Sequence, residues 1–153
     1  MPQNMPTELH DSLRPLEGDW TGEGEVYPNP WGPSGLTQCA WKFRMAHNGF
    51  HMIHDYREVR DGAFRFEAHG VISVDPSTGS IVWFLFDDYG FPPVDPARGG
   101  WKDGCLELVK STPRGVGRTQ LELSEQGLVY TVDFTPPGAN EPMVVARSTL
   151  RRV

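Results

Sequence analysis

The sequence has few cysteines and no long apolar segment. Cys39 and Cys105 are the only cysteines in 153 residues, and they lie far apart with no zinc-binding spacing, which argues against a disulfide framework or a structural zinc. No stretch approaches the roughly 18 apolar residues of a membrane-spanning helix. The first residues also lack the basic and apolar regions of a signal peptide. We therefore predict a reduced, cytoplasmic protein that does not bind membranes.

Positive charge and catalytic motifs are scarce as well. Fourteen basic residues against 20 acidic ones give a net charge of −6, which disfavours a nucleic-acid partner. The sequence contains no P-loop, nucleophile elbow, GxGxxG or HExxH motif, each of which would indicate a specific chemistry. We predict no metal site, and nothing in the sequence requires an enzyme.

Glycine and proline, in contrast, are plentiful. The 17 glycines and 14 prolines mostly separate apolar segments, as turns do in an all-β protein. After a flexible tail at residues 1–6, Thr7 can cap a short helix that has Leu9, Leu13 and Leu16 at helical spacing. The remaining chain alternates between strands and turns. The predicted strands cover 19–27, 36–46, 50–59, 63–74, 80–87, 105–110, 118–124, 128–134 and 142–151.

The turns predict how these strands are connected. Asn48-Gly49 and Asp61-Gly62 are signals for two-residue hairpin loops. Successive hairpins give an up-and-down meander, and closing it removes exposed strand edges. We predict one domain over residues 1–153, an antiparallel closed β-barrel of about ten strands with a short N-terminal helix. A β-sandwich is the alternative.

The first strand has an unusual inner face. Alternation places Trp20, Gly22, Gly24 and Val26 on one side and Thr21, Glu23 and Glu25 on the other, so the charged side should face solvent. Glycine weakens a strand and is tolerated where something approaches the backbone closely. The two glycines either clear volume inside the barrel or let the strand bend sharply.

The same strand carries a resemblance to known proteins. Gly-x-Trp after a short helix resembles the calycins, which include lipocalins and fatty-acid-binding proteins, and the run from Gly18 to Pro28 is similar to the opening of nitrobindins. The segments 75–79, 83–87 and 100–104 are similar to a bacterial branch of those barrels. The resemblance implies a barrel that holds a ligand. It also implies that a basic residue of the last strand, Arg147 or Arg151, covers Trp20.

The sequence departs from the nitrobindins at their haem site. Nitrobindins hold haem iron through a histidine near the C-terminus, whereas Val145 or Met143 occupies the matching position here and no histidine follows His69. Met143 is more simply explained as a core residue than as an axial ligand. We therefore expect no haem, and the haem-dependent isomerisation of peroxynitrite is not carried over.

Alternation along the strands indicates which side chains line the barrel. We expect apolar walls from Trp20, Trp41, Phe43, Phe66 and Trp83, space above Gly22 and Gly24, and polar contacts from His54, Tyr56 and Arg57. Such a cavity suits a small hydrophobic or amphipathic ligand. An inward Arg57 would pair with a ligand carboxylate. As an alternative, Arg57 forms a structural ion pair with Asp55 or Glu67.

The orientation of the third strand, 50–59, is ambiguous. A two-residue turn at Asn48-Gly49 places His54 and Tyr56 inside, whereas a two-residue turn at Asp61-Gly62 places Asp55 and Arg57 inside. Both cannot hold along one regular strand. A bulge in the strand or an odd-length loop must intervene, and we favour the bulge.

Three functional hypotheses follow. The first is a binding protein with an open cavity, the second an enzyme that uses His54 or Tyr56 in the same cavity, and the third a barrel filled by its own rings. The proline-rich segments 28–35 and 89–100 are either lids over the cavity or stiff connections. A homodimer stays open as an alternative to a monomer.

Overall fold

The computed structural model describes residues 4–153, so part of the tail expected at 1–6 lies outside the described residues. Within that range no helix is long and apolar enough to cross a membrane. Two helical segments come first, α1 (Glu8–Asp11) and the 3-10 segment Arg14–Leu16, and a second short 3-10 segment covers His47–Gly49. Ten strands make up the rest: β1 (Gly18–Val26), β2 (Gly35–Ala46), β3 (His51–Arg60), β4 (Phe64–Asp75), β5 (Ser80–Asp87), β6 (Ala97–Lys102), β7 (Cys105–Thr112), β8 (Gly115–Ser124), β9 (Gly127–Thr135) and β10 (Met143–Arg152).

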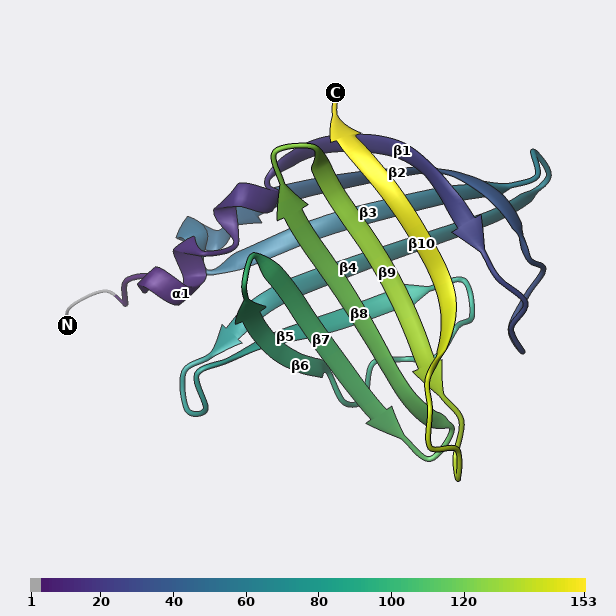
Figure 1. Cartoon of the computed structure of the whole chain (residues 1–153). Helices are drawn as coiled ribbons and strands as arrows, with labels where there is room; N and C mark the ends of the chain where they lie inside the picture. Colours follow the sequence, from purple (N-terminus) through teal and green to yellow (C-terminus); the bar gives the residue numbers. More distant parts are fainter. Residues whose placement is uncertain (1–3) are drawn as a thin grey trace.

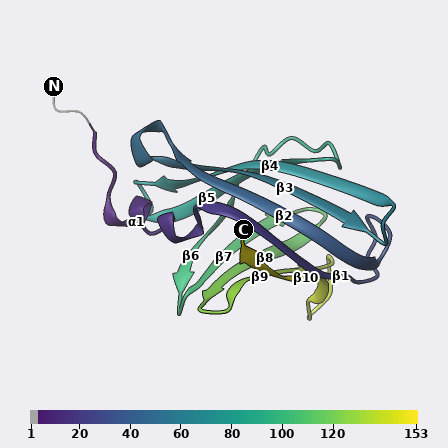
Figure 2. The ribbon, with the colours of Figure 1, turned by 90° about the horizontal axis from the view of Figure 1, so that it is seen from above.

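The ten strands form one closed antiparallel barrel in which each strand pairs with its sequence neighbours and β1 pairs with β10. The strands β7–β9 lie on the opposite side of the barrel from β2–β4 and cross them at a steep angle (Figures 1 and 2). The predicted fold class is confirmed. One strand was missed, because β6 (Ala-Arg-Gly-Gly-Trp-Lys) has no β-branched residue and its first four residues fell in the expected loop 89–100.

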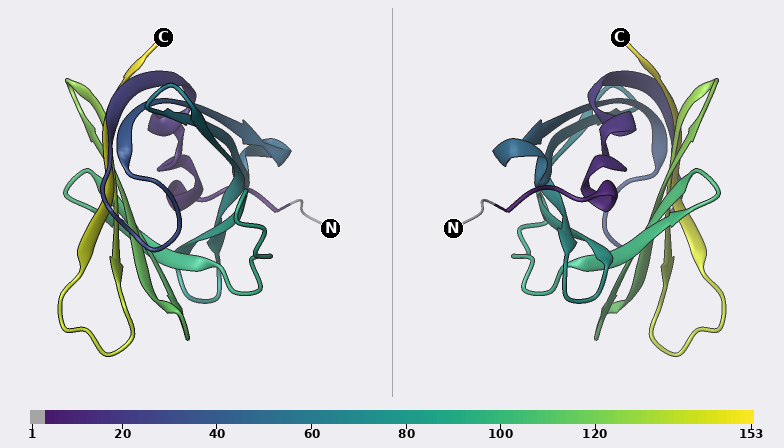
Figure 3. Two further views of the ribbon diagram at one scale, coloured as in Figure 1. Left: turned by 90° about the vertical axis from the view of Figure 1, so that its right-hand side faces the viewer. Right: turned by 90° about the vertical axis from the view of Figure 1, so that its left-hand side faces the viewer.

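One end of the barrel is closed by the helical segments. Leu13 and Leu16 are fully buried, and α1 lies across this end in the end-on views (Figure 3). The Trp20 indole donates a hydrogen bond to the Leu16 carbonyl at 2.8 Å. The guanidinium of Arg152 lies 4.2 Å from the centre of the Trp20 ring and donates to the Pro15 and Glu17 carbonyls. The last strand therefore does cover the tryptophan, but with Arg152, because Trp20 pairs in register with Arg152.

The orientation of β3 is set by the loop that follows it. Phe43 pairs with His54 across β2 and β3, as the Asn48-Gly49 turn predicts. Arg60 pairs with Phe64 across β3 and β4, which leaves a three-residue loop at 61–63. The loop has odd length, so β3 needs no bulge, and the bulge that we favoured is wrong. The even-numbered residues of β3 face the interior.

The glycines of β1 do not enlarge the interior. A Cβ at Gly22 would meet the backbone carbonyl of Thr149, and one at Gly24 would meet that of Arg147. Both contacts lie on β10, which pairs with β1. The glycines therefore let the two strands approach closely where the sheet closes, and the interpretation that they provide room for a ligand is wrong.

Candidate functional site

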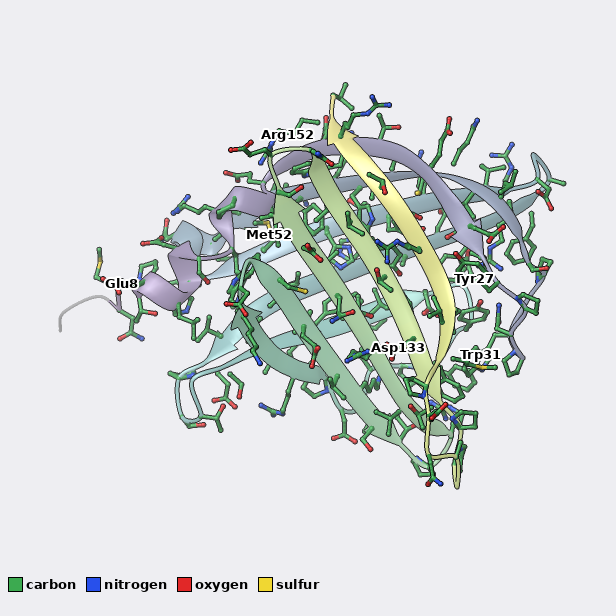
Figure 4. The ribbon with its side chains drawn as sticks, viewed as in Figure 1. Glu8, Tyr27, Trp31, Met52, Asp133 and Arg152 are labelled. Carbon is green, nitrogen blue, oxygen red and sulfur yellow. The ribbon has the colours of Figure 1, made fainter. Side chains whose placement is uncertain are left out.

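The interior of the barrel divides into a packed end and a hollow end. At the helical end, seven of the side chains that fill the barrel are at most 1% exposed: Leu13, Leu16, Met52, Ile72, Leu106, Leu128 and Leu150. Toward the other end lies a cavity of about 320 Å³. Figure 4 labels Met52 beside the helical end and Trp31 at the opposite end, where the cavity opens.

Aromatic rings form the floor of the cavity. The ring centre of Trp41 lies 4.6 Å from that of Tyr56 and 5.2 Å from that of Tyr130. Tyr130 also packs against Tyr56, with ring centres 5.7 Å apart. These three residues come from β2, β3 and β9, so the floor spans the barrel from one side to the other. Trp83, Leu85, Ala97 and Leu108 continue the apolar surface along the wall.

His54 lies beneath this floor and does not line the cavity. It is 1% exposed, and its Nε2 accepts a hydrogen bond from the Trp83 indole at 2.8 Å. Burial lowers the pKa of His54 from 6.5 to about 3, so the imidazole is neutral at pH 7. The neutral ring accepts through Nε2, and its proton is therefore on Nδ1.

A buried polar chain runs along β3 from the floor toward the mouth. The Tyr56 hydroxyl donates to Glu58 Oε1 at 2.6 Å, and Arg60 donates through Nε to Glu58 Oε2. Arg60 also donates through Nη1 to the Pro33 carbonyl at 2.8 Å. Both partners of the ion pair are about 5% exposed. Tyr56, Glu58 and Arg60 satisfy one another's hydrogen bonds, and the bond to Pro33 connects the segment 27–34 to the barrel wall.

Three other charged groups that line the cavity, Asp87, Lys110 and Arg114, have no ion-pair partner within 4 Å among residues 4–153, whereas Arg118 pairs with Asp133. Lys110 and Asp87 are half-buried and both line the cavity. Burial raises the pKa of Asp87, and the nearby Lys110 opposes that rise. Arg114 is exposed at the mouth, with its guanidinium 4.3 Å from the centre of the Phe91 ring.

Aromatic residues from two connecting segments border the mouth. Trp31, between β1 and β2, meets Phe134 of β9 edge to face, with ring centres 4.4 Å apart. Tyr89, between β5 and β6, packs against Phe66 with ring centres 5.2 Å apart. Trp31, Tyr89 and Phe91 all line the cavity, so the connections that sequence analysis singled out do meet at its entrance.

The residues predicted to line the cavity are found in three places. Trp41, Tyr56, Phe66 and Trp83 line it. Trp20, Phe43 and His54 are buried in the packed end below it. Arg57 is on the outer surface, where its side chain is 78% exposed and lies 3.7 Å from Glu67, so its prediction as an inward anchor is wrong and the alternative pairing with Glu67 is the one observed.

Several lining residues were missed by sequence reasoning. Glu58 and Arg60 continue the inward alternation of His54 and Tyr56, but the sequence analysis did not extend that alternation to charged residues near the end of the strand. Tyr130 was missed because the faces of its strand were not assigned. Lys110 was missed for the same reason, although it follows the inward-facing Leu106 and Leu108 at spacings of two. The regular alternation of β7 was the available signal.

The last strand does not provide a haem ligand. Val145 lines the cavity and Met143 is 39% exposed at the start of β10. His54 is the one buried histidine inside the barrel between residues 18 and 153, and its Nε2 is already bonded to Trp83. The residues present do not fit a haem held as in the nitrobindins.

Comparisons with known proteins identify the fold. The crystal structure of Rv2717c from M. tuberculosis is similar, with a TM-score of 0.71 and 16% sequence identity over 98% of this chain and 99% of that one. The structure of EF1p2_mFAP2b bound to DFHBI has a TM-score of 0.50 and 10% identity over 95% and 99% of the two chains. No curated protein matches the sequence. The family model described as "Protein of unknown function (DUF1579)" matches residues 5–91.

Proposed function

The chain belongs to the DUF1579 family, whose description states no function, and from the geometry of the barrel we propose that the protein binds a small hydrophobic or amphipathic molecule in its cavity, without haem. The observation that carries this proposal is the cavity of about 320 Å³ that opens to solvent between the aromatic segments. Its volume lies at the lower end of the range of about 300–1,000 Å³ found for small-molecule sites. A barrel filled by its own rings would leave no such space.

The lining favours a ligand with a flat apolar part. Trp41, Trp83 and Leu108 offer apolar surface inside the barrel, and covering it contributes about 25 cal/mol per Å² removed from water. Aromatic rings also prefer stacked or edge-to-face contacts with other rings. A compact aromatic or alicyclic molecule satisfies both conditions better than a long flexible chain, which loses more conformational freedom on binding.

In the similar structure described above, EF1p2_mFAP2b is bound to DFHBI, and its fold resembles that of this protein. This likeness supports the proposal that a barrel of this shape accommodates a small molecule. The resemblance of the first strand to nitrobindins and other calycins points in the same direction. We also propose that the protein is a member of the calycins.

An anionic group on the ligand would be held by Lys110 in place of Arg57. Among the charged groups at the cavity, Glu58 is paired with Arg60 and Asp133 with Arg118. The remaining charges are those of Asp87, Lys110 and Arg114, which sum to one positive charge. Lys110 has no ion pair within residues 4–153 and lies on the wall, so its ammonium group is free for a carboxylate or a sulfonate.

An enzyme that uses His54 or Tyr56 is the weaker alternative. His54 does not line the cavity, and with a pKa of about 3 it is a poor base at pH 7. Burial raises the pKa of Tyr56 well above 10, and its hydroxyl is bonded to Glu58. Neither group is poised to exchange a proton with a bound molecule.

Two matched dyes test the proposal, the neutral N-phenyl-1-naphthylamine and its sulfonated relative 1-anilinonaphthalene-8-sulfonate. We expect both to gain fluorescence with saturable binding to the wild-type protein. Lys110→Met should weaken the sulfonated dye about tenfold, since a hydrogen bond to a charged group contributes about 1.5–3 kcal/mol, and should leave the neutral dye unchanged. Arg57→Met, on the outer surface, is the control and should affect neither dye.

The outcomes separate the parts of the proposal. If neither dye binds the folded protein with saturation, ligand binding in the cavity is wrong. If both dyes bind and Lys110→Met weakens them equally, the cavity binds ligands but Lys110 does not recognise the anion.

A further inference from the structure

Two unpartnered ring nitrogens beside the cavity floor are donors. Trp41 Nε1 and His54 Nδ1 are both buried and have no hydrogen-bond partner among residues 4–153. The indole nitrogen can only donate, and the bond from Trp83 to His54 Nε2 leaves the proton of His54 on Nδ1. The two rings are adjacent, with centres 5.0 Å apart.

Tyr130 adds a third donor, and this one is reachable from the cavity. Its side chain lines the cavity, and its hydroxyl forms no hydrogen bond within the described part of the chain. Burial raises the pKa of Tyr130, and the nearby Glu58 carboxylate raises it further by a smaller amount. The phenol is therefore protonated at pH 7, and it presents an O–H group to whatever occupies the cavity.

The Glu58 carboxylate and His54 Nε2, which are acceptors near the floor, already take part in hydrogen bonds. Glu58 accepts from Tyr56 through Oε1 and from Arg60 through Oε2, and His54 accepts from Trp83. Burying a polar group without a hydrogen-bond partner destabilises the folded protein. A ligand that brought only donors would add to this excess, whereas a ligand that brings an acceptor relieves it.

We infer that the inner end of the ligand carries a neutral carbonyl group, as in a ketone, an aldehyde, an ester or a quinone, and that Tyr130 Oη donates a hydrogen bond to it. This inference rests on the proposed binding function and specifies the chemistry of the ligand at the floor. The group is neutral because the Glu58 carboxylate lies near Tyr130 and would repel a second carboxylate. Any charge on the ligand is at the other end, beside Lys110.

A pair of probes with the same shape tests the inference. 2-Acetylnaphthalene has a carbonyl oxygen where 2-isopropenylnaphthalene has a methylene group. We expect Tyr130→Phe to weaken binding of the ketone about 3- to 10-fold and to change binding of the alkene less than twofold. Tyr56→Phe is the matched control: its hydroxyl is bonded to Glu58, so this variant should shift the affinities of both probes by the same factor.

An infrared spectrum of the bound ketone gives a second measurement. The carbonyl stretching band of the ketone bound to the wild-type protein should lie at lower wavenumber than the band of the ketone in hexane, because a hydrogen bond weakens the C=O bond. The shift should disappear in Tyr130→Phe.

Each outcome decides a specific point. If neither naphthalene binds the folded protein, the proposed function and the inference fall together. If both bind, and Tyr130→Phe weakens them by equal factors or the carbonyl band matches that in hexane, the cavity binds ligands but does not recognise a carbonyl through Tyr130.

Discussion

Trp83 and His54 are joined by a hydrogen bond of 2.8 Å between two buried rings, in space that exists because residue 70 is glycine. A Cβ at Gly70 would meet His54 Nε2 and would lie 2.8 Å from Trp83 Nε1. The bond links β3 to β5 across β4, just beneath the floor of the cavity. It therefore fixes the indole that forms part of the cavity wall.

The first prediction concerns this glycine. Gly70→Ala should destabilise the fold by about 1–3 kcal/mol, because the added methyl group displaces one ring and leaves polar atoms without partners. Urea denaturation measures the loss. Gly117→Ala is the control, since a Cβ at Gly117 meets nothing within 4 Å, and its stability should equal that of wild type or exceed it. Equal stability of both variants would contradict the described packing.

The second prediction is a pH dependence of stability. His54 has a folded-state pKa of about 3 against 6.5 in the unfolded chain, so below pH 6.5 the unfolded state binds a proton that the folded state does not. Stability should fall as pH decreases from about 6.5 toward 3, with a contribution that approaches 1.4 kcal/mol per pH unit.

The variant His54→Gln isolates this contribution, because other titrating groups are common to both proteins. Free energies of unfolding measured between pH 7 and pH 4.5 should decline more steeply in wild type than in the variant. Parallel profiles would show that His54 titrates normally and is not buried as described.

The third prediction compares two arginines of β3. Arg60→Met should destabilise the protein by about 3–5 kcal/mol, since it leaves the Glu58 carboxylate buried without its partner. Arg57→Met should have little effect on stability because its ion pair with Glu67 is exposed. Chemical denaturation of the two variants tests which face of β3 points inward. The reverse order would require the opposite orientation of the strand.

The fourth prediction compares two tyrosines of the floor. Tyr56→Phe should cost about 1–3 kcal/mol, because Glu58 loses the donor of a buried hydrogen bond. Tyr130→Phe removes a hydroxyl that forms no hydrogen bond within residues 4–153, and should leave stability unchanged or slightly higher. Thermal unfolding without ligand makes the comparison. A large loss in Tyr130→Phe would mean that its hydroxyl has a structural partner.

Much of the fold could be predicted from local patterns. Alternation along β2 and β4 identified Trp41, Phe43 and Phe66 as inward residues, and the Asn48-Gly49 signal gave the observed register of β2 with β3. These features depend on residues that are close together in the sequence. The loop after Arg60 has three residues, with Asp61 and Gly62 both at positive φ, and a dipeptide signal does not distinguish it from a two-residue loop.

The candidate site was harder to predict because it depends on contacts between distant strands. Sequence analysis named neither Glu58 nor Arg60, and their ion pair inside the barrel follows only once β3 is oriented. From the sequence of β1 alone, Gly22 and Gly24 could leave space inside the barrel. The structure shows that the backbone of β10 occupies the space beside them. Tyr130 reaches Trp41 from the far side of the barrel, a contact that no local pattern encodes.

The central claim, that the cavity holds a ligand, is tested most directly by filling it. Gly117 faces the cavity and Gly100 lies between the exposed Arg98 and Lys102 on the outer surface, and a Cβ at either position meets nothing within 4 Å. In a fluorescence titration with N-phenyl-1-naphthylamine, Gly117→Leu should bind the dye at least tenfold more weakly than wild type, while Gly100→Leu should bind it normally. Undiminished binding by a folded Gly117→Leu protein would contradict the account.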